Sequence, residues 1–263
     1  MPTPKDLSLA NRLVAFLPSR KRSFFIEHSE LVELKPSVVL GRAGHATPHA
    51  YFPVDSFVSL SLPMAGAPDA GYTLVGNEGM FSASTALGMA DATFTCTVQG
   101  AGRALRIRER ELKRLLLDDA CLRELMQHYV HVCLGQLALQ AACVSLHTTE
   151  QRLARWLLMT RDRADSTELF LTQETLALML GVRRESITRA AGALQRHGLI
   201  SYGRGYLMLL DEPGLLTTAC PCYRADLDLY EQAFAAPPHA CHTPKPASRN
   251  AMPNSTSMSR AAS

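Results

Sequence analysis

The stretch Leu171–Leu209, LTQETLALMLGVRRESITRAAGALQRHGLISYGRGYLML, has the pattern of two short helices followed by a β-hairpin. Thr172 is suited to cap the first helix, since a threonine side chain accepts a hydrogen bond from a free backbone N–H. Gly181 is suited to end that helix, because glycine adopts the positive φ angle of a sharp turn. The second helix is expected over residues 184–197, with an inward stripe of Ile187, Ala190, Ala191 and Leu194. This combination predicts a helix-turn-helix.

Polar and charged side chains crowd the first turns of the second helix. They are Arg184, Glu185, Ser186, Thr188 and Arg189. An arginine can donate two parallel hydrogen bonds to guanine, and a carboxylate can accept one from cytosine. We therefore expect this helix to read bases in the major groove of double-stranded DNA, with Arg183, Thr172 and Gln173 also at the interface.

A hairpin is expected directly after the second helix. Leu199–Tyr202 and Tyr206–Leu209 are predicted as its strands, and Arg204 at the tip is placed to contact a phosphate. The alternative to this winged arrangement is a small helical core whose arginines form only a solvated face.

This stretch resembles the C-terminal domain of the Crp/Fnr superfamily of bacterial transcription regulators. The resemblance rests on Arg184, Glu185, Ser186, Ile187 and Arg189, which match the pattern of the recognition helix in that family position by position. It implies a winged helix-turn-helix that binds DNA. At the position before this pattern, occupied here by an arginine, many relatives carry a Ser or Thr cap, and the loss of that cap costs about 1 kcal/mol.

The length and composition allow two modest domains. The chain has 263 residues, and its net charge of +3 is too small to indicate nucleic-acid binding by itself. We find no apolar run that approaches the length of a bilayer span and no signal peptide, so we expect a cytoplasmic protein without a membrane partner. The seven cysteines are odd in number and several lie in apolar patterns, so we expect no structural disulfide.

Short β-prone runs separated by turn residues fill the segment from Phe24 to Ile107. They are LVELKP, SVVL, HAYFPV, SFVSLSLP, YTLVG, TCTVQ and ALRI, and they predict an antiparallel β-roll like a jelly roll. This segment resembles the cyclic-nucleotide-binding sensor domain of the same superfamily. The expected fold class is α+β, with the β-roll first, a long helix next and the winged helix-turn-helix last.

The resemblance also locates a candidate effector pocket at Gly79, Ser82, Ser84, Phe94 and Thr95. Relatives that bind cyclic nucleotide carry a Gly-Glu pair and, about ten residues later, an arginine for the phosphate. Here no Gly-Glu pair follows Phe81, and a phenylalanine takes the place of the arginine. We therefore expect a degenerate pocket that does not bind cyclic AMP.

We identify no cofactor from the sequence. The N-terminal cysteine cluster that holds an iron–sulfur cluster in some relatives is missing, because the first cysteine is Cys96. The haem candidates, interpreted as exposed histidines, are His45, His49, His128 and His131.

A long helical pattern runs from Glu109 to Leu146. Its apolar seam, at alternating spacings of three and four residues, comprises Leu122, Leu125, Met126, Tyr129, Val132, Cys133 and Leu137. Because relatives dimerise through the helix at this place, the resemblance implies a homodimer that reads a palindromic site, with RNA polymerase as a further partner. The alternative is a helix that packs only on its own β-roll.

The expected division of the chain is a sensor β-roll at 8–112, a dimerisation helix at 113–146, a DNA-binding domain at 147–222 and a disordered tail at 223–263. The only tryptophan, Trp156, falls in the first helix of the DNA-binding domain. We assign no metal site. Cys220, Cys222, Cys241 and His242 could form one, but an exposed, redox-sensitive pair of thiols is the preferred interpretation.

These features favour a sequence-specific transcription regulator that is not an enzyme. One alternative is a cupin-like enzyme using the β-roll, but the region of His45 and His49 lacks partner ligands at strand spacing. The other is an effector-binding protein with no role at DNA, which the arginine-rich helix argues against.

Overall fold

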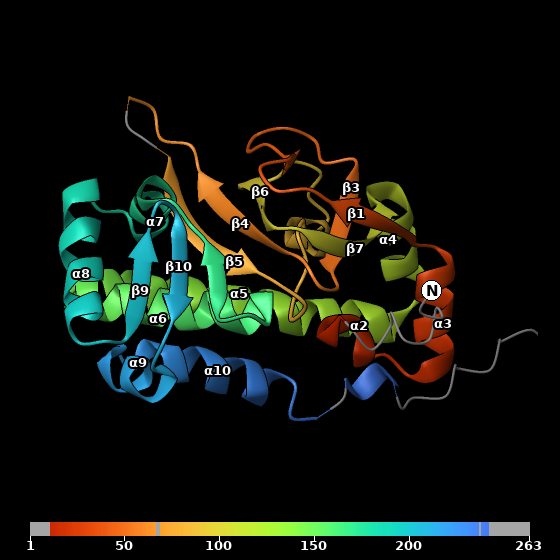
Figure 1. The fold of residues 1–263 in the computed structure, drawn as a ribbon. Coiled ribbons are helices and arrows are strands. Elements are labelled where there is room, and N and C mark those ends of the chain that lie inside the picture. Colours follow the sequence, from red (N-terminus) through yellow and green to blue (C-terminus); the bar gives the residue numbers. More distant parts are fainter. Residues whose placement is uncertain (1–10, 67–68, 237, 242–263) are drawn as a thin grey trace, which may run out of the picture.

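The computed structural model describes residues 11–66, 69–236 and 238–241 (Figure 1). Its helices are α2 (Arg12–Ala15), α3 (Ser19–Glu27), α4 (Glu109–Asp118), α5 (Ala120–Leu146), α6 (Thr149–Ala164), α7 (Gln173–Leu180), α8 (Arg184–Arg196), α9 (Glu212–Thr218) and α10 (Cys222–Ala233), with short 3₁₀ helices η1 (Ala83–Leu87) and η2 (His239–Cys241). Its strands are β1 (Glu30–Leu34), β2 (Val39–Gly41), β3 (His49–Pro53), β4 (Phe57–Leu62), β5 (Ala70–Val75), β6 (Thr95–Gly100), β7 (Gly102–Arg108), β8 (Glu168–Phe170), β9 (Ile200–Gly203) and β10 (Tyr206–Leu209). The expected α+β fold class is confirmed.

The N-terminal half is a β-roll made of antiparallel sheets with the strand orders β1-β7-β3 and β2-β6-β4-β5. Side chains alternate between the faces of β3, because successive residues of a strand point to opposite sides. Tyr51 joins the apolar cluster between the sheets, with Val58 and Cys96. Phe52 faces the other way and joins a second cluster under the helices. The strand runs expected from the sequence are all present, so β-prone residues bounded by turn residues located them correctly.

The spacing of Leu13, Val14 and Leu17 predicts a short amphipathic helix from Ser8 to Leu17. The helix α2 covers Arg12–Ala15 of this segment, and residues 8–10 lie outside the described part of the chain. Asn11 sets the start: its side-chain oxygen accepts from the N–H of Val14 at 3.0 Å. Its amide nitrogen donates to the carbonyls of Pro53 at 2.8 Å and Gly79 at 3.0 Å. One buried asparagine therefore both caps α2 and fastens it to the β-roll.

The long helical pattern from 109 to 146 is divided in two. Asp119 separates α4 from α5, because its carboxylate accepts from the N–H groups of Cys121 at 2.9 Å and Leu122 at 3.3 Å and so starts a new helix. The helix α5 then extends for 27 residues along the sheets (Figure 1). By length and composition alone α5 is long and apolar enough to cross a membrane. The mean hydropathy of its most apolar 18-residue segment is 1.4, and 17% of that segment is buried. The expectation that no apolar run approaches the length of a bilayer span was therefore wrong.

The chain beyond residue 222 is more ordered than we expected. Instead of a tail, α10 packs along α5, and the residues on its inner face recur every four positions: Cys222, Asp226, Tyr230 and Phe234. The Tyr230 hydroxyl donates to the carbonyl of Glu78 at 2.8 Å, and the ring of Phe234 stacks on Phe16 with centroids 4.7 Å apart. The rest of the predicted tail, residues 242–263, lies outside the described residues.

The expectation of no disulfide was also wrong. Cys121, in the first turn of α5, is bonded to Cys241 at the end of η2, 120 residues away. The bond joins the last described segment of the chain to α5. A pairing between residues so distant in sequence leaves no local pattern from which it could be predicted.

Candidate nucleic-acid interface

The turn between α7 and α8 forms as the sequence predicts. The Thr172 hydroxyl accepts from the N–H of Thr175 at 3.1 Å and starts α7, and Gly181 ends it with a φ of 60°. Arg183 occupies the N-cap position of α8 without a side-chain hydrogen bond, as expected for a residue that replaces a Ser or Thr cap. The side chain of Arg183 is exposed and available for a contact outside the protein.

One face of α8 is packed against the protein. Ile187 and Leu194 are fully buried, and the small side chains of Ala190 and Ala191 let α8 lie close to its neighbours. These four residues share an apolar cluster with residues of α6 and α7. Burial on this scale stabilises a fixed orientation of the helix, at roughly 25 cal/mol for each Å² of apolar surface.

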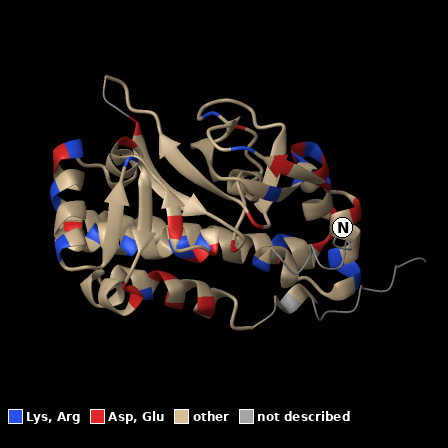
Figure 2. Ribbon diagram, viewed as in Figure 1, with Lys and Arg blue, Asp and Glu red and all other residues tan. Residues whose placement is uncertain are grey.

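The opposite face of α8 is exposed and polar. Arg184 is held toward α7: its Nε donates to Gln173 Oε1 at 3.2 Å, and its Nη1 lies 3.2 Å from Glu174 Oε1. Thr188 Oγ1 donates to the same Gln173 oxygen at 3.1 Å. Glu185 and Arg189 are exposed and Ser186 is half-buried. Figure 2 shows several blue segments along α8, with a red segment in its first turn.

The wing contains one strand more than we predicted. Its strand order is β8-β10-β9, and β8 was missed because three residues give too short a pattern. Arg204 and Gly205 form the hairpin turn with φ angles of 53° and 84°, the conformation of a two-residue hairpin loop. The side chain of Arg204 is exposed at the tip. The exposed rings of Phe170 and Tyr206, which we did not predict as interface residues, pack edge to face beside it at 5.3 Å.

The helix-turn-helix is packed directly on the β-roll. At Gly71 of β5 an added Cβ atom would lie 2.4 Å from the Cα of Met179 and 2.8 Å from the carbonyl oxygen of Leu178, so only glycine allows this approach of α7. Farther along the contact, the Glu78 carboxylate lies 2.8 Å from the Arg163 guanidinium. Both of these charged side chains are largely buried. The position of α8 is therefore tied to the sheet that contains β5.

The candidate effector pocket is a small cavity between the β-roll and α5, with a volume of about 100 Å³. The structure brings Ser82, Ser84 and Phe94 to its lining, and leaves Gly79 and Thr95 outside it. Gly79 instead packs against the ring of Tyr129, and Thr95 Oγ1 accepts from the N–H of Ala43 at 3.3 Å.

Four aromatic residues contribute to the lining of the cavity. Tyr72 stacks on Phe94 with centroids 4.8 Å apart, and its hydroxyl donates to the carbonyl of Cys133 at 3.0 Å. Burial raises the pKa of Tyr72 and of Tyr129, so both hydroxyls stay neutral. Within the described chain, no lysine, arginine, aspartate or glutamate lines this cavity.

The apolar seam that we assigned to a dimer interface lies mostly in the protein's own core. The buried members are Leu122, Leu125, Met126, Tyr129 and Val132, all at most 4% exposed. These five side chains pack within one chain, against residues of the β-roll and of the neighbouring helices, so it is the exposed residues of α5 that are free for a second chain. Cys133 is half-buried, and Leu137 is 41% exposed.

Residues 151–218 match the family of Crp-like helix-turn-helix domains. No curated protein matches the sequence of this chain. Among solved structures, FixK2 from Bradyrhizobium japonicum is similar with a TM-score of 0.62 and 13% identity, over 73% of this chain and 98% of that one. The c-di-GMP-responsive regulator CLP from Xanthomonas campestris is similar with a TM-score of 0.61 and 16% identity, over 74% of this chain and 100% of that one.

A CRP-family transcriptional regulator from Thermus thermophilus gives a TM-score of 0.61 and 17% identity, over 72% of this chain and 96% of that one. At sequence identities this low, the structural similarity shows a common fold and no more. That fold is a β-roll followed by a C-terminal helix-turn-helix. The domain match adds the DNA-binding function for residues 151–218. Residues 151–218 therefore form a Crp-like helix-turn-helix domain, and the chain as a whole has the fold of the Crp/Fnr regulators to which it is similar.

Proposed function

We propose that this protein binds a palindromic promoter site as a homodimer, and that it does so without a cyclic nucleotide. The observation that carries the proposal is the contrast between the faces of α8. Its inward stripe of Ile187, Ala190, Ala191 and Leu194 is buried, while Arg184, Glu185 and Arg189 face the solvent. A helix fixed in this way offers a rigid polar surface to the major groove.

The roles of the polar residues follow from their chemistry and position. Arg184, Glu185 and Arg189 are proposed to contact base edges, with Thr188 and Ser186 beside them. Arg183 and Arg204 are proposed to contact phosphates from the two ends of the interface, and Thr172 and Gln173 to approach the backbone at the start of α7. Since Gln173 already holds Arg184, the protein orders one base-reading arginine before DNA binds.

A dimer interface is proposed on the exposed face of α5. In place of the buried seam, the second half of the helix presents an apolar stripe to the solvent: Leu134, Leu137, Ala138, Ala141 and Val144. These residues recur at spacings of three and four, as in a helix that pairs with another helix, and the alanines permit close approach. An exposed apolar stripe of this kind accounts for the hydropathy of α5 without a membrane.

Two α5 helices around a two-fold axis would place the two α8 helices in successive major grooves. The expected half-sites lie about 10 base pairs apart, centre to centre. We also propose that the protein acts in the cytoplasm, has no catalytic activity and contacts RNA polymerase at its promoters. Crosslinking of the DNA-bound protein to purified polymerase would test that last contact.

Cyclic nucleotides are not expected to bind the cavity beneath β5. A cyclic phosphate removed from water needs charged or hydrogen-bonding partners, and the cavity offers an aromatic pair and small hydroxyl groups instead. The volume of the cavity, about 100 Å³, is also far below the usual volume of a binding site for a ligand as large as a cyclic nucleotide.

Selection of DNA fragments from the host genome by the purified full-length chain would test the proposal. We expect the enriched fragments to share an inverted repeat, and to be enriched equally with and without cyclic AMP. Enrichment that follows only base composition, with no common repeat, would overturn the specificity. A requirement for cyclic AMP would overturn the effector part alone.

A further inference from the structure

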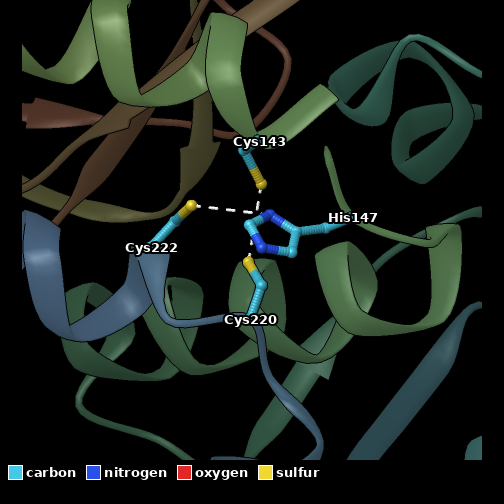
Figure 3. A group of neighbouring side chains, drawn as sticks. All are labelled: Cys143, His147, Cys220 and Cys222. Carbon is cyan, nitrogen blue, oxygen red and sulfur yellow. Dashed lines mark hydrogen bonds between the residues drawn. The ribbon is translucent and has the colours of Figure 1, made fainter. Parts of the chain in front are cut away.

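Three cysteines and one histidine meet at the joint between α5 and the DNA-binding unit (Figure 3). Cys143 lies in the last turn of α5 and His147 follows that helix directly. Cys220 lies between α9 and α10, and Cys222 is the first residue of α10. One ligand atom from each residue can be chosen so that all four lie within 4.8 Å of one another.

The four side chains point toward a common centre. The Cys143 and Cys220 sulfurs are 3.5 Å apart, and the Cys222 sulfur is 3.6 Å from Nδ1 of His147. Cys143 and Cys220 are each 1% exposed and Cys222 is 7% exposed. The three thiols form a buried cluster apart from the larger apolar cores, so they do not serve as ordinary core side chains.

We propose that these four residues bind a single Zn²⁺ ion. Zinc in structural sites is tetrahedral, with bonds of about 2.3 Å to sulfur and 2.0–2.1 Å to nitrogen, which places neighbouring ligand atoms about 3.5–3.8 Å apart. The separations of 3.5 and 3.6 Å agree with these values. In a multi-iron cluster the cysteines bind different iron atoms, so their sulfurs lie farther apart. Here no two ligand atoms are separated by more than 4.8 Å, which fits a single ion.

The charges around the cluster suit such an ion. Three thiolates and one Zn²⁺ carry a net charge of −1, which needs compensation in a buried site. Arg152 and Arg155 are each 6% exposed and line one cavity with Cys143. Arg152 donates to the carbonyl of Leu180. Arg155 donates to Gln140 Oε1 at 3.0 Å, while its Nε has no partner within the described chain.

The site links parts of the chain that are distant in sequence. Cys143 belongs to the helix that presents the proposed dimer stripe, whereas Cys220 and Cys222 belong to the end of the DNA-binding unit. A bound ion would therefore fix α5 relative to α9 and α10, and with them the direction in which α8 faces. This differs from the metal site we considered in the sequence, because Cys241 is in a disulfide and His242 lies outside the described residues.

The test uses the full-length chain, purified with a thiol reductant that does not bind metals. Elemental analysis should give about one zinc per chain. Replacement of the zinc by Co²⁺ should give the visible bands of tetrahedral cobalt and a near-ultraviolet band of thiolate-to-cobalt charge transfer. In the native protein Cys143, Cys220 and Cys222 should resist alkylation until a chelator removes the ion.

Two variants and a matched control complete the experiment. Cys222→Ser and His147→Gln should each lower zinc retention after dialysis by more than about tenfold, because each removes one of the four ligands. Cys133→Ser, ten residues before Cys143 on the same helix, should retain the ion. Circular dichroism establishes whether each variant is folded. If a variant does not fold, the cobalt spectrum of the native protein decides whether these residues bind the metal.

A folded native protein that binds neither zinc nor cobalt stoichiometrically would overturn the proposal, as would an octahedral cobalt spectrum. Retention of the ion by both ligand variants would also overturn it. A metal-free protein that forms a bond between Cys143 and Cys220 on air oxidation, and still binds no metal after reduction, would replace the metal site by a redox pair.

Discussion

The helices α8 and α5 both bury one face, and the difference between their exposed faces separates their roles. The outer face of α8 is polar and contains arginines, with one glutamate among them. The outer face of α5, in its second half, is formed mainly by leucine, valine and alanine side chains. A polyanion is a suitable partner for the first surface and another apolar helix for the second. Burial, and not hydrophobicity alone, therefore identifies the face of a helix that is free for a partner.

The largest expected effect distinguishes the two faces of α5. Leu125→Asp should lower the free energy of unfolding by more than about 3 kcal/mol, because it buries an unpaired carboxylate at a fully buried position. Leu134→Asp, on the exposed face, should change the stability of the monomer by less than about 0.5 kcal/mol but separate the dimer. Chemical denaturation and sedimentation equilibrium measure the two quantities. The same response from both variants would show that the stripe is wrongly placed.

A somewhat smaller effect is expected at the contact that positions α8. Gly71→Val should push α7 away from β5, since an added Cβ would lie 2.4 Å from a backbone atom of Met179, at a cost of about 1–3 kcal/mol. Trp156 lies at this contact and is 7% exposed, so its fluorescence should shift to longer wavelength. Gly203→Ala is the control, because an added Cβ there meets nothing within 4 Å. An unchanged emission spectrum in the Gly71 variant would argue against the docked arrangement.

A smaller effect again is expected on DNA binding, and it differs between the middle of α8 and its last turn. Arg189→Ala should weaken binding to the best site by about 1–3 kcal/mol and relax the base preference at one position in each half-site. Arg196→Ala, in the last turn of the same helix, should weaken binding to all sequences by a smaller and uniform amount. Fluorescence anisotropy with cognate and scrambled duplexes measures both. Equal losses on cognate and scrambled DNA in the Arg189 variant would rule out a direct contact with a base.

The smallest expected effect is no effect. Millimolar cyclic AMP or cyclic GMP should produce no binding heat and no change in DNA affinity, because charged partners for a phosphate are missing from the lining of the cavity in the described chain. Isothermal titration calorimetry is the measurement. A micromolar dissociation constant for either nucleotide would mean that Ser82 and Ser84 contribute to a phosphate site that we have not identified.

The sequence predicted the recognition helix well because its signals are local. Gly181, the stripe that contains Ile187 and the cluster around Glu185 all fall within a few turns of one another. The strands of the β-roll were predicted for the same reason, since each is a short run of β-prone residues bounded by turn residues.

The sequence could not predict features that depend on contacts between distant segments. Both faces of α5 are apolar, so periodicity could not show that Leu125 belongs to the core and Leu134 to the surface. The start of the expected tail at residue 223 was wrong because Asp226 and the adjacent charges hide the repeat of buried positions in α10. The cluster of Cys143, His147 and two later cysteines is brought together only by folding, so the spacing of the cysteines alone did not indicate it.

The most direct test of the central proposal is a titration of one selected operator against the same duplex with one half-site replaced. We expect two chains to bind the intact duplex, with a loss in affinity of at least 10-fold, about 1.4 kcal/mol, when one half-site is replaced. Leu134→Asp should remove most of that difference, because separated chains read each half-site independently. Binding of a single chain to the intact operator, with equal affinity for both duplexes, would contradict the proposal that a dimer reads a palindromic site.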